Sequence, residues 1–288
     1  MEENQPTVNN TLKFIESNLA HVSNPKFEAE LILALSLNKD RLDILANPNR
    51  LLTPWQIKSV TNLIERRKNG EPFAYLEGQK EFFGRPFIVT SNTLIPRPET
   101  EGLINHAKTI VKNIKQPKIL DVGTGSGVIA ITLALELSDS QITATDISAD
   151  ALIIAKKNAS KHDVDNRIKF KEQNLLEGET EKFDLIVANL PYVEREWLTK
   201  SDQSVELQQE PSTALLGGEK GTEIIEEFIA QFIHEAPAPK VLLEHGDNQA
   251  ETLTSLAKKL NPKVHTFSYQ DFSGKNRYLL ISLEDFLH

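Results

Sequence analysis

The sequence predicts an α/β protein in which a small helical bundle precedes a seven-stranded, mostly parallel sheet that closes with an antiparallel hairpin. The first 75 residues show only helical patterns, and apolar runs alternate with helical stretches from residue 96 onward. Such alternation is typical of a parallel sheet covered by helices. The last two apolar runs are joined by residues 271–276 alone, too short for a helical crossover, so they must pair antiparallel.

The chain accordingly divides into three predicted segments. They are a helical domain (1–75), a β-hairpin linker (76–95) and a sheet-containing domain (96–288).

Helix signals dominate the first segment. Asn24-Pro25 is a cap followed by proline in the first turn, and Thr53 with Gln56 forms a predicted capping box. The helix that follows Thr53 ends in Arg66-Arg67-Lys68, where positive charge favours the negative end of the helix dipole. We interpret this basic trio as helix-end electrostatics rather than as a nucleic-acid contact.

The second segment changes character. Phe82–Val89 predicts two short strands around a turn. Pro96 and Pro98 then hold the chain extended until a helix begins near Glu99.

The third segment contains the alternating pattern. Its predicted strands are 118–122, 141–146, 167–172, 183–188, 240–245, 264–269 and 277–283. Its predicted helices are 99–114, 127–137, 148–162, 220–235 and 247–260.

Composition excludes several classes of protein. The 288 residues contain no cysteine, so disulfides and thiolate metal sites are excluded, and no histidine spacing suggests another metal site. No apolar stretch approaches the ~18 residues of a membrane span, and the polar start does not suggest a signal peptide, so a cytoplasmic protein is expected. The net charge of -9 argues against direct nucleic-acid binding. We expect a monomer.

A glycine-rich turn follows the first strand of the third segment. Gly123-Thr124-Gly125-Ser126-Gly127 allows close approach of a ligand, and Asp146, at the end of the next strand, can accept hydrogen bonds from ribose hydroxyls. Val128 stands where a dinucleotide-binding turn would have its third glycine, which disfavours a nicotinamide cofactor. Tight packing and helix capping are the alternative explanations of the glycines and of Asp146.

The ends of the third and fourth strands complete this predicted site. Asn174 and Leu175 are placed to meet an adenine, although an ordinary loop asparagine is an equal alternative for Asn174. A nucleoside with a sulfonium cation, S-adenosyl-L-methionine, suits such a pocket better than a pyrophosphate cofactor because it needs ribose acceptors more than a phosphate cradle.

Asn189-Leu190-Pro191-Tyr192 ends the fourth strand and predicts the chemistry. The Asn189 side-chain oxygen and the Leu190 carbonyl can each accept one N–H of a planar amide or amine and aim its nitrogen at a methyl group. Pro191 fixes the turn, and Tyr192 can offer a ring face to a planar group. An asparagine-proline turn that merely ends a strand is the structural alternative. Positioning alone can drive such a transfer, so no general base is assigned.

At these residues the sequence resembles the HemK/PrmC family of protein-(glutamine) methyltransferases. The resemblance covers nearly the whole chain, and its most specific part is Arg97-Pro-Glu-Thr-Glu101 together with the helical domain. Further matching motifs are Glu81–Gly84, Asp121–Gly127, Asp146, Glu210-Pro211, Leu215–Gly218, Gly221, Glu244–Gly246 and Asp271–Gly274.

The resemblance implies a Rossmann-like class I methyltransferase sheet and a role in translation termination. It implies that S-adenosyl-L-methionine, converted to S-adenosyl-L-homocysteine, binds Gly123–Gly127, Asp146 and Asn189. Residues 189–192 would then hold the glutamine amide of the GGQ motif in peptide chain release factors.

Two positions depart from the family pattern. Leu190 replaces a usual proline, which costs the turn one rigid ring but keeps the carbonyl, and Asn174 replaces a frequent aspartate, which predicts weaker adenine binding. Two other functions remain open at this stage: methylation of an exocyclic adenine amine in nucleic acid, and a degenerate cofactor-binding protein without turnover.

Overall fold

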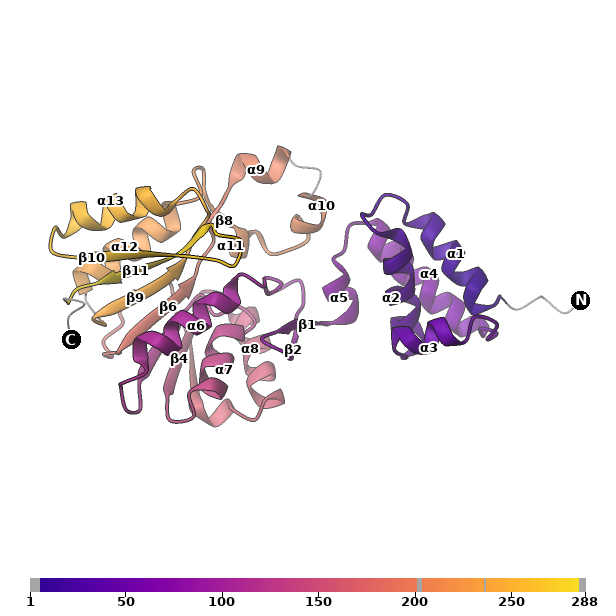
Figure 1. Cartoon of the computed structure of the whole chain (residues 1–288), viewed down its shortest axis with the longest axis horizontal. Coiled ribbons are helices and arrows are strands. Elements are labelled where there is room, and N and C mark those ends of the chain that lie inside the picture. Colours follow the sequence, from indigo (N-terminus) through magenta and orange to yellow (C-terminus); the bar gives the residue numbers. More distant parts are fainter. Residues whose placement is uncertain (1–5, 201–203, 236, 285–288) are drawn as a thin grey trace, which may run out of the picture. The chain divides into compact units, whose positions relative to one another are not determined.

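A computed structural model describes residues 6–200, 204–235 and 237–284. The chain forms two compact units, Met1–Glu77 and Gly78–His288 (Figure 1). Within the described residues, no helix combines the length and apolar character needed to cross a membrane.

The first unit is helical, as its sequence predicts. It contains α1 (Val8–Asn18), α2 (Pro25–Leu37), α3 (Arg41–Ala46), α4 (Pro54–Lys68) and α5 (Phe73–Glu77). Buried residues from different helices, among them Ile15, Leu33 and Ile64, form its core. The predicted capping box is present, because the Gln56 N–H meets Thr53 Oγ1 at 3.3 Å while the Gln56 side chain accepts from the Thr53 N–H at 2.9 Å.

The basic end of α4 has partners within this unit. Arg67 is buried and forms an ion pair with Glu28 of α2 at 2.6 Å, and Arg66 pairs with Glu71 just past the helix end. These arginines therefore join elements of the bundle.

A hairpin opens the second unit. Its strands β1 (Gln79–Phe82) and β2 (Arg85–Ile88) pair antiparallel, and Phe82 and Phe87 are buried in the core of this unit. The sequence assigns this hairpin to a separate linker, whereas the structure packs it against the sheet-containing domain. Buried Asn158 explains the attachment, because its side chain accepts from the Ile88 N–H at 2.7 Å and donates to the Ser126 carbonyl at 2.8 Å.

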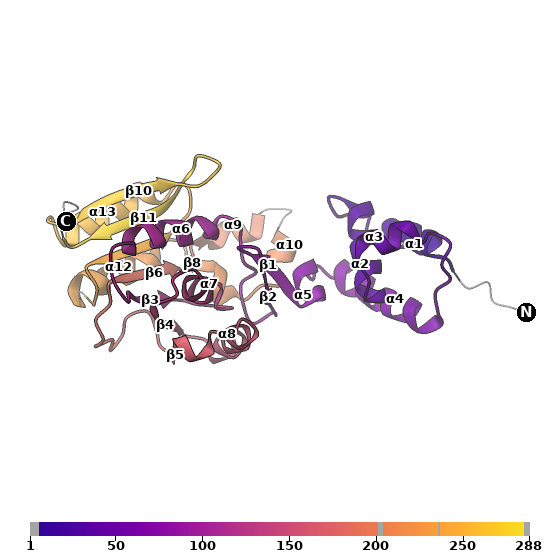
Figure 2. The ribbon, with the colours of Figure 1, turned by 60° about the horizontal axis from the view of Figure 1, so that its bottom comes forward.

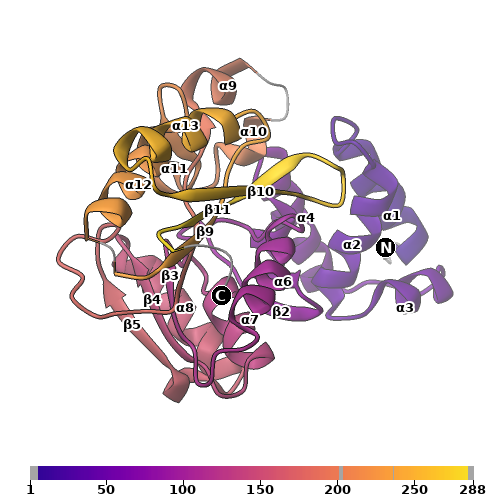
Figure 3. The ribbon, with the colours of Figure 1, turned by 60° about the vertical axis from the view of Figure 1, so that its left-hand side comes forward.

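The seven-stranded sheet has the order β10-β11-β9-β6-β3-β4-β5, which confirms the predicted fold class (Figures 2 and 3). The strands are β3 (Lys118–Val122), β4 (Gln141–Asp146), β5 (Ile168–Glu172), β6 (Leu185–Asn189), β9 (Lys240–Glu244), β10 (His265–Gln270) and β11 (Asn276–Ser282). Strands β5, β4, β3, β6 and β9 run parallel, and β11 pairs antiparallel with both β9 and β10.

Helices cover both faces of this sheet. On one face lie α6 (Thr100–Val111), α7 (Val128–Glu136) and α8 (Ala149–Lys161), and on the other α12 (Glu223–Glu235) and α13 (Ala250–Leu260). Alternate strand residues serve the two faces, since Leu185 and Val187 join one hydrophobic core while Ile186 and Ala188 join the other. The continuous apolar runs of the sequence are thus explained by burial on both sides.

A segment between β6 and α12 was not predicted. It contains β7 (Val193–Glu194), α9 (Arg195–Lys200), α10 (Ser204–Leu207), α11 (Ser212–Leu215) and β8 (Leu216–Gly218). Outside this segment, a 3₁₀ turn (Asp165–Arg167) before β5 was also not predicted. Strands β7 and β8 form a small parallel pair. These elements are too short for periodicity to reveal them.

Candidate active site

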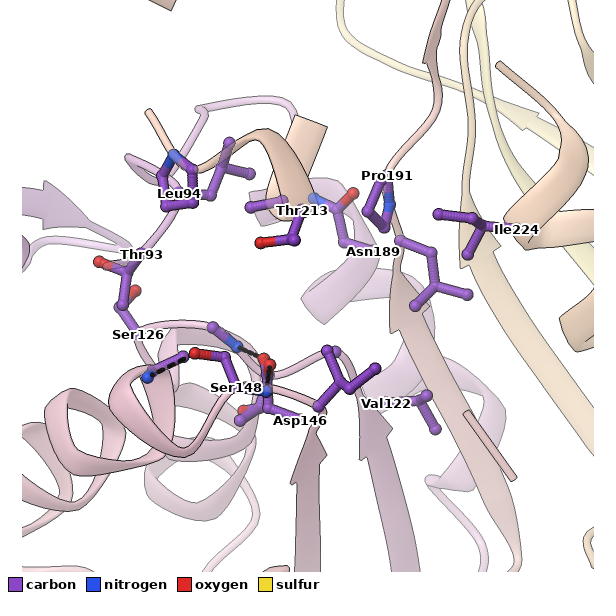
Figure 4. Close-up of a pocket in the computed structure, with 18 of the residues that line it drawn as sticks. Thr93, Leu94, Val122, Ser126, Asp146, Ser148, Asn189, Pro191, Thr213 and Ile224 are labelled. Carbon is purple, nitrogen blue, oxygen red and sulfur yellow. Dashed lines mark hydrogen bonds between the residues drawn. The ribbon is translucent and has the colours of Figure 1, made fainter. Parts of the chain in front are cut away.

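A cavity of about 440 Å³ lies where the strand order reverses between β3 and β6. Ligands of open parallel sheets bind at this kind of crevice. Figure 4 shows Asp146 and Ser148 on one side of the cavity and Asn189, Pro191 and Thr213 on the other. Ten predicted residues line it: Gly123, Thr124, Gly125, Ser126, Asp146, Asn174, Leu175, Asn189, Leu190 and Pro191. Gly127 and Tyr192 are absent from the described lining.

The glycine turn is held by Asp146. Its Oδ2 accepts the Gly125 N–H at 2.8 Å, and its Oδ1 accepts the Ser148 N–H at 2.8 Å. Burial raises the pKa of Asp146, and these backbone N–H groups oppose the rise. Gly127 lies deeper, where a Cβ would stand 3.2 Å from Ala155 of α8, so this third glycine serves helix packing.

Asp121, on β3, supports the same turn and was given no role from the sequence. It is completely buried, and its Oδ2 accepts from the Thr124 hydroxyl at 2.6 Å and from the Ala130 N–H at 3.1 Å. Burial raises the pKa of Asp121 to about 7, against the effect of these hydrogen bonds. An acid that follows two apolar strand residues, and stands two positions before the first glycine of the turn, is the signal that could have identified it.

The end of β5 supplies another wall of the cavity. Leu175 is buried with a φ of 45°, and the Asn174 side chain donates to Glu177 Oε1 at 2.9 Å. Gln173, which directly follows β5, also lines the cavity, as does Ile147 directly after β4. Neither residue was predicted.

The corner after β6 contains the partly exposed Asn189 and the buried Leu190. The Asn189 amide nitrogen donates to Thr100 Oγ1 at 3.0 Å. The Leu190 side chain is buried against the glycine turn, with Cδ2 3.0 Å from where a Cβ on Gly123 would stand.

Tyr192 lies behind this corner instead of offering its ring to the cavity. Its hydroxyl donates to Glu244 Oε1 at 3.2 Å, and its backbone carbonyl accepts from the Gln249 side chain at 3.0 Å. Burial, together with the nearby Glu244 charge, raises the pKa of Tyr192.

Two segments far apart in sequence close the remaining side of the cavity. Thr93, Leu94, Pro96 and Arg97 precede α6, and Pro211–Ala214 surround the start of α11. The buried carboxylate of Glu210 joins the segments, because it accepts from the Ile95 N–H at 2.9 Å and from Arg97 at 2.6 Å. The motifs at 94–101 and 210–211 were visible in the sequence, but their contact was not.

The end of β9 places two buried titratable groups beside the Asn189 corner. Burial raises the pKa of Glu244 to about 7, and it lowers the pKa of His245, whose Nδ1 lies 2.7 Å from the Gly246 carbonyl. In the described part of the chain, no cluster of three or more acidic or histidine side chains is arranged to hold a metal ion.

Two protein-family models match this chain. Residues 10–78 match the PrmC N-terminal domain, and residues 100–212 match the methyltransferase small domain. A release factor glutamine methyltransferase of Koribacter versatilis is 38% identical over 250 residues, covering 86% of this chain and 88% of that protein. The chain belongs to the release factor glutamine methyltransferase family. The resemblance stated from the sequence motifs is thereby confirmed.

Some relatives are much longer than this chain, and the solved structures of similar fold are more distant in sequence. A bifunctional methyltransferase of Rickettsia bellii is 39% identical over 293 residues, which cover 91% of this chain but 52% of that protein. The chain therefore spans about half the length of such relatives. The catalytic domain of hMettl16, solved with an RNA hairpin, superposes with a TM-score of 0.59 at 16% identity, covering 85% of this chain and 87% of that one. This likeness shows the fold alone.

Proposed function

We propose that this protein methylates the side-chain amide nitrogen of the glutamine in the GGQ motif of peptide chain release factors, with S-adenosyl-L-methionine as methyl donor. One observation carries the proposal: Asn189, at the end of β6, lines the same cavity as the glycine turn and Asp146. A methyl donor and an amide acceptor can therefore meet in one place.

The cavity residues fit this cofactor. A volume of about 440 Å³ is within the usual range for small-molecule sites. A Cβ on Gly125 would meet nothing within 4 Å, so the turn leaves open space toward a ligand. Asp146 would hold the ribose hydroxyls, and Asn174 and Leu175 would meet the adenine. S-adenosyl-L-methionine, when bound, supplies an electrophilic methyl group on a sulfonium.

The corner at 189–191 would position the acceptor. The Asn189 side-chain oxygen and the Leu190 carbonyl would each accept one N–H of the glutamine amide, which orients its nitrogen and favours the positive charge that develops on it. The proton can leave afterwards to water. Tyr192 would support the corner from behind through Glu244 and Gln249. The helical unit would recognise the folded release factor.

Mass spectrometry of a purified release factor tests the proposal. With cofactor and enzyme, a gain of one methyl group is expected on the GGQ glutamine, and Asn189→Ala should abolish it. Asn105→Ala, at an exposed site on α6, is the control that should retain activity. Methyl transfer to adenine in DNA or RNA instead would support a nucleic-acid methyltransferase, and cofactor binding without any transfer would support a degenerate binder.

A further inference from the structure

The side-chain amide of Asn189 has two chemically opposite ends. The oxygen can accept an N–H from a substrate, whereas the NH₂ group can only donate. Catalysis by this residue therefore requires that the oxygen, and not the nitrogen, face the cavity. The structure directs the nitrogen to Thr100 Oγ1 at 3.0 Å, which leaves the oxygen available.

Thr100 can hold this orientation only if its own proton is directed elsewhere. A hydroxyl can donate or accept, and Thr100 lies at the cavity wall with only 2% of its surface exposed. Helix α6, which begins with Thr100, packs against both β6 and β9, and Glu244 ends β9. The Thr100 hydroxyl lowers the pKa of Glu244 against the effect of burial. A carboxyl oxygen of Glu244 can accept the threonine proton, which would leave the oxygen lone pairs of Thr100 for Asn189.

The position of Glu244 is built into the sheet. It is the register partner of Asn189 in the parallel pairing of β6 and β9, and it is completely buried. Its Oε1 accepts the Tyr192 hydroxyl, while its Oε2 has no hydrogen-bond partner among the described residues. The carboxylate thus has unused accepting capacity beside Thr100.

We propose that Thr100 is a positioning residue, held in an accepting role by buried Glu244, which fixes the Asn189 amide with its oxygen turned into the cavity. This inference rests on the proposed function for its catalytic consequence, but the amide orientation can be measured without turnover. Thr100 acts through Asn189 and needs no contact with substrate.

Side-chain amide spectroscopy of the full chain labelled with ¹⁵N-asparagine tests the orientation. Asn189→Asp identifies the Asn189 NH₂ signals by their loss. These signals should shift and exchange faster with solvent in Thr100→Val, which lacks the acceptor, and should stay near their wild-type values in Thr100→Ser. Unchanged Asn189 signals in Thr100→Val would overturn the proposal, whether or not release factors prove to be substrates.

Kinetics separate positioning from a general loss of structure. Thr100→Val should lower kcat for release-factor methylation by about 10-fold, the effect of losing one hydrogen bond, while the Kd of S-adenosyl-L-methionine changes less than about 2-fold. Thr100→Ser should restore most of kcat. Thr109→Val, an exposed position on the same helix, should leave kcat unchanged. Equal kcat in wild type and Thr100→Val would refute the catalytic role, and absence of methylation by the wild type would refute only the proposed substrate.

Discussion

Asp146 Oδ2 accepts the backbone N–H of Gly125 at 2.8 Å, so the acid that ends β4 holds in place the turn that follows β3. The other carboxylate oxygen accepts the Ser148 N–H, and both oxygens keep lone pairs for a ligand. Asp146→Ala removes both functions and should weaken S-adenosyl-L-methionine binding by about 10- to 100-fold, since hydrogen bonds to charged groups are strong. The affinity of Asp146→Asn for the cofactor should lie between those of the wild type and the alanine variant. Titration calorimetry measures this, and an alanine variant with wild-type affinity would contradict it.

The turn should also be sensitive at Gly123. Its φ of +73° disfavours any other residue, and a Cβ would stand 3.0 Å from Leu190 Cδ2. Gly123→Ala should therefore lower the free energy of unfolding by about 2–4 kcal/mol, from backbone strain plus overpacking. Gly84→Ala is a matched control, because its φ is +71° but a Cβ there meets nothing within 4 Å, and it should cost only about 1–2 kcal/mol. Equal losses in urea denaturation would show that Leu190 does not restrict the turn.

The two segments that close the cavity should depend on Glu210. Its side chain is 2% exposed and pairs with Arg97, which is 33% exposed, while also accepting the Ile95 N–H. Glu210→Ala should lower the free energy of unfolding by about 2–4 kcal/mol. This loss is somewhat smaller than for a fully buried ion pair, because Arg97 is partly exposed. The same substitution should weaken cofactor binding. The exposed Arg195–Glu219 pair provides the control, since Glu219→Ala should cost less than about 1 kcal/mol. A loss at Glu210 no larger than at Glu219 would contradict this role.

Replacing Asn174 by the aspartate frequent in the family should strengthen cofactor binding, but Glu177 should limit the gain. The Asn174 amide nitrogen donates to Glu177 Oε1, and an aspartate would instead place two carboxylates together. We expect the largest gain, about 3- to 10-fold in Kd, in Asn174→Asp combined with Glu177→Gln. Full affinity in the wild type, with no gain in either variant, would refute the prediction that asparagine weakens adenine binding.

Asp121 should make stability depend on pH. Its pKa is raised to about 7 in the folded state from a model-compound value of 3.8, mainly by burial. Between these values the folded protein binds more protons than the unfolded chain, so stability falls as pH rises toward 7. Asp121→Asn should reduce this fall by roughly 2–4 kcal/mol, at about 1.4 kcal/mol per pKa unit. Urea denaturation at several pH values between 4 and 8 measures the slope, and an unchanged slope in the variant would exclude Asp121 as its source.

Much of the fold could be predicted because its information is local. Strands buried on both faces are continuous apolar runs, and the short connection before Arg277 leaves only an antiparallel pairing. The glycine turn, Asp146 and Asn189 could also be assigned to one site, since the carboxyl ends of parallel strands meet at one edge.

What the tertiary structure decided involves residues distant along the chain. Glu210 meets Arg97 across 113 positions, and Thr100 meets Asn189 across 89. The hairpin joined the core of the second unit, and Tyr192 turned toward Glu244 instead of the cavity, through packing that no sequence period encodes. Periodicity reports which face of an element is buried. Which polar groups then meet depends on how far side chains reach between elements already packed, and only the folded chain determines that.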